Sequence, residues 1–108
     1  MDFLVEIEVT LPAELDEAIR TRLANDELER GRTLADAGLL RAIWRVPGRL
    51  ANKAIWTAAD ATELNTALTS LPLWPYMDVA VTALAHHPLS DACGGLARPD
   101  GGSGFGDA

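Results

Sequence analysis

Apolar residues occupy every second position from 3 to 9, and the positions between them, 2 to 10, are polar apart from Leu4. This two-residue period is typical of a strand with one buried face. Pro12 ends the alternation, and a proline without an N–H suits the approach to a helix. Residues 13–37 are rich in alanine, leucine, glutamate and arginine, and Gly38 is a natural helix stop. We therefore predict a strand and then a long helix, with an apolar stripe formed by Leu15, Ile19, Leu23 and Leu34.

Two strands with a tight connection are predicted next, over residues 40–46 and 52–57, with Pro47-Gly48 marking the turn. Asp60 suits the N-cap of a second helix. A connection stiffened by two prolines then leads to a last strand over residues 77–84.

The resulting order is β-α-β-β-α-β, which is the ferredoxin-like pattern of the α+β class. It predicts a four-stranded antiparallel sheet with both helices on one face and the other face bare. Apolar residues occur on both sides of several strands, so the bare face needs a cover, and a second subunit is the usual one. We therefore expect a homo-oligomer of the dimeric α+β barrel type.

Length and charge limit the class of protein. The 108 residues fit one domain, assigned to residues 1–90, followed by a flexible glycine-rich tail over residues 91–108. A net charge of −7 repels phosphate backbones and anionic membranes, so we expect neither nucleic acid nor membrane as a partner. A signal-peptide pattern and a membrane-spanning apolar stretch are both missing, which leads us to expect a cytoplasmic protein.

Several enzyme classes lack their motifs. No glycine-rich phosphate loop follows a strand, and no His-Glu-x-x-His segment is present. The single cysteine, Cys93, excludes a Cys-x-x-Cys pair. The adjacent His86 and His87 would face opposite ways on a strand, so structural roles are favoured over a shared metal ion.

Glu27 is the candidate for acid–base chemistry. It lies four positions after Leu23 and eight after Ile19, so it points along the apolar stripe toward the sheet. Gly31, one turn later, leaves open space beside it. Desolvation there would raise the pKa of the carboxyl toward the range useful for proton transfer. The alternative is a structural glutamate that reaches solvent or pairs with Arg30, and the pattern alone does not decide between the two.

Arg41 and Arg45 are candidates for holding a substrate carboxylate. They are four apart on a predicted strand and are expected on the same face, where two guanidinium groups could bind a carboxylate by paired hydrogen bonds. Surface salt bridges are the alternative, which the spacing alone favours. Trp44 is expected on the opposite face, in the core.

Asn52 and Tyr76 are further candidates for a pocket. Asn52 could donate a hydrogen bond to a carbonyl or shape the turn after Gly48, and the sequence alone favours the turn. Tyr76 and Trp74 lie in the proline-stiffened connection, where a pocket wall and simple packing explain them equally well.

Taken together, these motifs resemble those of the muconolactone isomerase family. The resemblance covers about residues 1–90 without insertions. It is carried by Val9-Thr10-Leu11-Pro12, Asp26-Glu27-Leu28-Glu29, LRAIWRVPG at 40–48, Ala51-Asn52, LPLWPYMD at 71–78 and His87-Pro88.

The resemblance implies a ferredoxin-like isomerase that converts a small lactone, muconolactone, to the enol lactone of 3-oxoadipate in the β-ketoadipate route of aromatic breakdown. It implies that no metal or cofactor is needed, and that dimers assemble into larger rings, typically decamers. In this reading Glu27 is the general base and acid, and Arg41, Arg45, Asn52 and Tyr76 are candidate substrate-binding residues.

Two alternatives stay open. Leu4, Ala42 and Arg49 stand where some relatives have basic residues, so a relative that isomerises or cyclises another enolisable metabolite, such as a polyketide, would look much the same. The other alternative is a non-catalytic ferredoxin-like domain whose apolar sheet face only mediates assembly. A buried Glu27 in a pocket with an arginine favours the isomerase, whereas a solvent-exposed Glu27 without a pocket favours the assembly domain.

Overall fold

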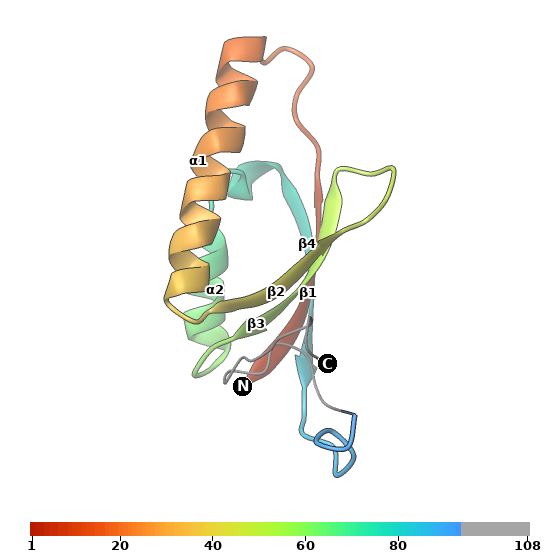
Figure 1. The fold of residues 1–108 in the computed structure, drawn as a ribbon. Helices are drawn as coiled ribbons and strands as arrows, with labels where there is room; N and C mark the ends of the chain where they lie inside the picture. The colour runs from red at the N-terminus through yellow and green to blue at the C-terminus, as the bar shows by residue number, and fades with distance from the viewer. Residues whose placement is uncertain (94–108) are drawn as a thin grey trace.

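The computed structural model describes residues 1–93 of the chain, and most of the predicted tail lies outside them. The elements follow the predicted order (Figure 1). They are β1 (Asp2–Val9), α1 (Glu17–Asp36), β2 (Leu40–Arg45), β3 (Ala51–Thr57), α2 (Ala61–Thr69), the short 3-10 helix η1 (Trp74–Tyr76) and β4 (Met77–Leu84).

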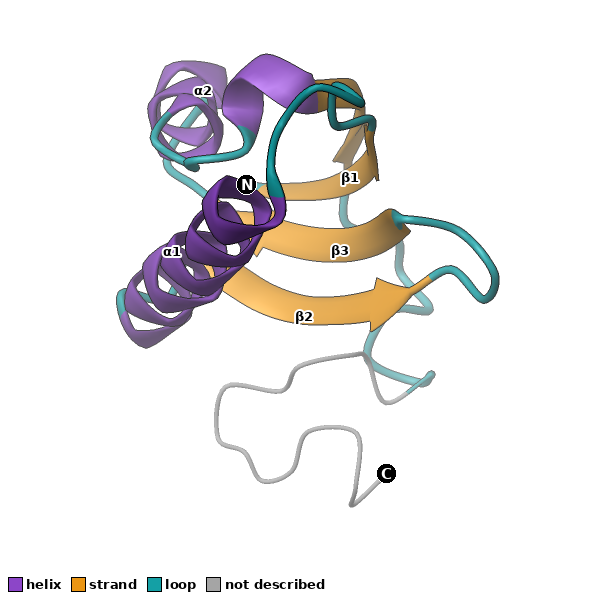
Figure 2. Cartoon of the chain, turned by 90° about the horizontal axis from the view of Figure 1, so that it is seen from above, coloured by secondary structure: helices purple, strands orange, loops and turns teal. Residues whose placement is uncertain are grey.

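The four strands form one open antiparallel sheet in the order β2-β3-β1-β4. Both helices lie on the same face of this sheet, as the two views show (Figures 1 and 2). The predicted ferredoxin-like arrangement is therefore confirmed. Within residues 1–93 no helix covers the opposite face, which we call the uncovered face.

The core lies between the sheet and α2. Alternate residues of β1 are buried, as the two-residue period predicted, and they pack with Trp56 of β3 and Leu64 and Leu68 of α2. Each fully buried large apolar side chain contributes about 1.5–3 kcal/mol. By contrast, Leu34 is the one buried residue of α1. The long helix is therefore held less tightly against the sheet than α2.

Side-chain caps determine where the helices begin. The Asp16 carboxylate accepts the Ile19 N–H at 2.9 Å, so α1 starts at Glu17 rather than at residue 13 as predicted. The predicted cap of α2 is confirmed, because Asp60 accepts the Glu63 N–H at 2.9 Å.

An irregularity in β2 changes which side chains share a face. The pairing with β3 shifts register between Leu40 and Ala42, so Arg41 is an extra residue in the strand. The Arg41 guanidinium donates to the Thr57 hydroxyl at 3.4 Å, on the uncovered face, whereas Arg45 pairs with Asn52 on the helix side. The prediction that Arg41 and Arg45 share a face is therefore wrong, because one inserted residue reverses the alternation.

Trp44 also differs from its prediction. It lies opposite Lys53 in the register of the edge strand, 43% of its surface is exposed, and it is one of the residues that line the cavity between α1 and the sheet. It is therefore not a core residue of this chain.

Gly31 is expected to weaken α1, because glycine in a helix interior costs about 0.5–1 kcal/mol relative to alanine. A Cβ atom built at Gly31 would meet no heavy atom within 4 Å. We expect Gly31→Ala to raise the free energy of unfolding by about 0.5–1 kcal/mol in urea titrations. Gly38→Ala is the matched control, since its φ of +84° makes the same change destabilising. A destabilised Gly31→Ala variant would show that the space beside Glu27 cannot take a methyl group.

Candidate functional site

A cavity of about 600 Å³ lies between α1 and the sheet. Its walls come from one face of α1, from the helix side of β1, β2 and β3, and from the segment that follows α2. Most of the lining is apolar, including Ile7, Leu40 and Trp56. This size and composition are typical of sites for small molecules.

Glu27 brings a carboxylate into this cavity. It lies on the sheet-facing side of α1 and is half-buried. Burial raises the pKa of its carboxyl above the usual value of 4.5, and a hydrogen bond from the Leu73 N–H lowers it in part. That N–H lies 2.9 Å from Oε1. The predicted orientation of Glu27 and the direction of its pKa shift are both confirmed. The alternative pairing with Arg30 is not observed, because the Arg30 guanidinium donates to the Ser70 hydroxyl at 2.9 Å.

Arg45 and Asn52 face the cavity from the sheet. They are direct partners in the β2–β3 register, and both line the cavity. Side chains at such positions start about 5 Å apart at Cβ, so a guanidinium and an amide there can reach the same ligand. Oδ1 of Asn52 is buried without a hydrogen-bond partner among the described residues. Asn52 is thus a strand residue with unused hydrogen-bonding capacity rather than the turn residue that its sequence position favoured.

Arg32 is a further charged residue of the cavity that the sequence reasoning missed. It follows Glu27 by five positions and shares the cavity-facing side of α1 with Leu28. The sequence feature that could have indicated this position for Arg32 is its spacing of four residues from Leu28 on a long helix. The cavity therefore holds two cationic side chains, Arg32 and Arg45, with one acidic side chain, Glu27. This balance suits an anionic ligand.

The other two candidates lie away from the cavity. Arg41 reaches Thr57 on the uncovered face, as described above. Tyr76 ends η1, and its carbonyl accepts the Thr10 N–H at 2.9 Å. Neither residue lines the cavity. The segment around Tyr76 contributes Leu71 and Leu73 to the wall instead.

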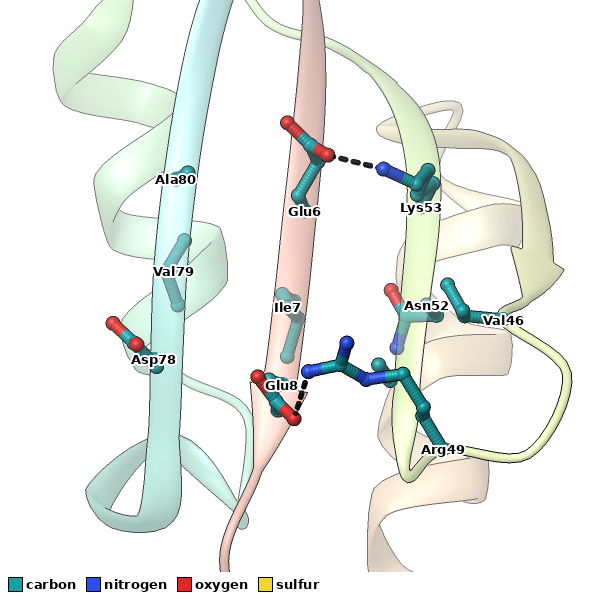
Figure 3. Close-up of a pocket in the computed structure, with 11 residues that line it drawn as sticks. Glu6, Ile7, Glu8, Val46, Arg49, Asn52, Lys53, Asp78, Val79 and Ala80 are labelled. Carbon is teal, nitrogen blue, oxygen red and sulfur yellow. Dashed lines mark hydrogen bonds and ion pairs between the residues drawn. The ribbon is translucent and has the colours of Figure 1, made fainter.

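A second, smaller depression of about 310 Å³ lies on the uncovered face (Figure 3). Four of its five charged groups form two ion pairs, Lys53 with Glu6 and Arg49 with Glu8, the latter at 2.6 Å, and Asp78 is the fifth. Such exposed pairs are screened by solvent, and both remain in contact with water. The cavity beside Glu27 is therefore the stronger candidate for a functional site.

In the described part of the chain, no group of three or more histidine, cysteine, aspartate or glutamate side chains is placed to bind a metal ion. His87 makes two local hydrogen bonds, which fit the structural role that its sequence position favoured. Its Nδ1 accepts the Leu89 N–H at 2.9 Å, and the backbone N–H of His87 donates to the Ser90 hydroxyl at 3.1 Å. Neither helix within residues 1–93 combines the length and apolar content needed to span a membrane.

Comparison with known proteins gives one consistent result. The family model described as muconolactone delta-isomerase matches residues 1–90. A muconolactone delta-isomerase 2 from Acinetobacter lwoffii is 40% identical over 90 residues, which cover 83% of this chain and 94% of the relative. A muconolactone delta-isomerase from Pseudomonas putida is 39% identical over the same shares. A crystal structure of muconolactone isomerase superposes with a TM-score of 0.77 at 39% identity, covering 82% of this chain and 92% of that one.

Proposed function

The chain belongs to the muconolactone delta-isomerase family, and we propose that the cavity beside Glu27 is the active site at which it isomerises muconolactone. The observation that carries this proposal is the half-buried carboxylate of Glu27, with a raised pKa, in a cavity that also contains arginine. A non-catalytic assembly domain has no need for such a group, because burying a carboxylate costs free energy.

The reaction moves a carbon–carbon double bond within a five-membered lactone. The base removes a proton from the ring carbon that carries the acetate arm, and the electron pair spreads through the double bond to the lactone carbonyl. The resulting dienolate takes the proton back at the carbon next to the carbonyl. The proton count is unchanged, so a single carboxylate above the ring can act first as base and then as acid.

Glu27 fits this double role because its pKa is raised from 4.5 by desolvation. A carboxyl with a pKa closer to neutrality holds a proton well enough to return it and still releases it at the working pH. The apolar lining limits water in the cavity, which strengthens electrostatic interactions within it.

Arg45 and Asn52 fit the two polar ends of the substrate. The guanidinium of Arg45 matches the free carboxylate of the acetate arm, which a planar pair of N–H donors can bind. The amide of Asn52, beside it in the register, can donate to the lactone carbonyl, where negative charge develops in the dienolate. Arg32 adds positive potential from the opposite wall.

The proposal is tested by mixing purified protein with muconolactone in deuterated water and following the reaction by proton NMR. The enol lactone should form without added cofactor. A chain that binds the lactone without converting it would contradict the proposal. Conversion of another enolisable lactone in place of muconolactone would instead support the same site with a different substrate.

The uncovered face supports assembly with a second copy of the chain. Apolar side chains on this face include Leu4 and Ile55, which are partly exposed, and Leu84, which is 40% exposed. Exposed apolar surface of this kind is typical of subunit contacts. We infer a homo-oligomer in which sheets face each other, with a decamer as the expected final state.

Light scattering should therefore give a mass well above the 11.5 kDa of one chain at micromolar concentration. Leu84→Glu should lower that mass, because it places a charge in the contact. Leu89→Glu is the matched control, since Leu89 is 60% exposed and lies beyond β4. A stable monomer of the unaltered chain would disprove the inference.

A further inference from the structure

Glu27 is held by a backbone group from a distant part of the chain. Its Oε1 accepts the Leu73 N–H at 2.9 Å, across 46 residues of sequence. This is the one hydrogen bond that the Glu27 side chain makes within residues 1–93, so Oε2 has no protein donor there. The two oxygens of the carboxylate are therefore in different environments.

We propose that the Leu73 N–H is a positioning group that fixes Oε1 of Glu27 and leaves Oε2 as the oxygen that carries the proton. The proposal rests on the proposed function, since it concerns how the same carboxylate works. A backbone amide suits this task because it cannot titrate and donates equally well at every working pH.

The position of the Leu73 N–H is set by its own segment rather than by Glu27. The Trp74 N–H donates to the Leu71 carbonyl at 2.9 Å, and the Tyr76 N–H donates to the Leu73 carbonyl at 2.8 Å. Leu71 is 6% exposed and belongs to the core, and prolines at 72 and 75 restrict the backbone between these bonds. The donor is thus preorganised before any substrate binds.

A second contact ties the same segment to α1. Arg30, one turn after Glu27, donates from Nε to the Ser70 hydroxyl at 2.9 Å. The Ser70 hydroxyl in turn donates to the Ala67 carbonyl at 2.6 Å, at the end of α2. Two side chains of α1, Glu27 and Arg30, therefore hydrogen-bond to the start and the middle of this one segment, which helps to keep the carboxylate beside its donor.

This arrangement separates the structural and chemical tasks of Glu27. A hydrogen bond to a carboxylate favours its charged form, and the bonded oxygen is the less basic of the two. Proton transfer therefore goes to Oε2, and the carboxylate keeps one orientation in both half-reactions. Holding a catalytic group in one geometry removes an entropic part of the barrier, and a displacement of about 1 Å can cost roughly 100-fold in rate.

Replacing the Leu73 amide by an ester tests the proposal without changing any side chain. The α-hydroxy analogue of leucine, incorporated at position 73, substitutes an oxygen for the N–H. We expect kcat to fall roughly 10- to 100-fold, with KM changed less than about threefold. The acidic limb of the pH profile of kcat/KM should also move to higher pH, because the lost donor favoured the charged carboxylate.

An ester at Ala58 is the matched control. It removes the bond that the Ala58 N–H donates to the Met1 carbonyl at 2.9 Å, between residues that do not line the cavity, and leaves the Leu73 donor and its segment in place. We expect it to leave the acidic limb unmoved. If the Leu73 ester keeps its kcat and its acidic limb, or if both esters lose the same activity without a shift of the limb, the proposal is overturned. Loss of activity in Glu27→Gln beside an unaffected Leu73 ester would reject this inference alone, whereas full activity of Glu27→Gln would reject the proposed function.

Discussion

Replacing Glu27 by glutamine should lower kcat by roughly 10²- to 10⁴-fold, which is the range that general acid–base catalysis typically supplies. Glutamine keeps the size of the side chain, and its amide oxygen can still accept the Leu73 N–H, but it cannot take up a proton at neutral pH. KM should change much less than kcat, because in the proposed mechanism the carboxylate acts on the reacting carbons rather than on the acetate arm. Initial rates with muconolactone, measured in parallel for both proteins, check this expectation.

Glu29→Gln is the matched control for that experiment. Glu29 is two residues away on the same helix and is exposed, so the change removes the same charge without touching the cavity. Its turnover should stay within about twofold of the unaltered chain, as expected for a surface change. Near-full turnover in Glu27→Gln, with a loss in Glu29→Gln, would show that the assignment of the proton carrier is wrong.

The free energy of unfolding gives an independent measure of the environment of Glu27. The pKa of Glu27 is raised in the folded state, so its ionisation disfavours folding as the pH rises through this raised pKa. Glutamine has no such ionisation. Glu27→Gln should therefore be more stable than the unaltered chain at neutral pH, and the difference should disappear below the ordinary pKa of 4.5. Urea unfolding at several pH values measures this, and a gain confined to acidic pH would contradict it.

Replacing Arg45 by glutamine should raise KM for muconolactone by roughly 10- to 100-fold, because a hydrogen bond to a charged group contributes about 1.5–3 kcal/mol. The effect should fall mainly on KM, since the acetate arm is bound alike before and during the proton transfer. Arg45 lines the cavity beside its register partner Asn52, which places its guanidinium within the proposed site.

Arg41→Gln is the control, because Arg41 lies on the uncovered face and contacts Thr57. Its KM should stay within about twofold of the unaltered value. Arg32→Gln should give an intermediate increase, since Arg32 is an exposed residue at the cavity wall. Equal and small effects of Arg41→Gln and Arg45→Gln would mean that both arginines serve only as surface charges.

The order of elements was determined by the sequence alone. A two-residue period in β1, a helical period in α1 and the proline and glycine turns are local features, so they can be read from neighbouring positions. The same holds for the cap at Asp60 and for the direction of Glu27, because a helix repeats regularly enough to carry its pattern over several turns. The family resemblance, also carried by local motifs, was confirmed by the comparisons.

Only the tertiary structure decided how the site is assembled. The extra residue at Arg41 reverses the alternation in β2, and nothing in the local pattern marks it. The separation of Tyr76 from the cavity and the inclusion of Arg32 depend on how α1 and the segment after α2 pack on the sheet. The bond between Glu27 and the Leu73 N–H joins groups 46 residues apart. A sequence period describes neighbours along one element, whereas these features arise where separate elements meet, and packing alone sets their geometry.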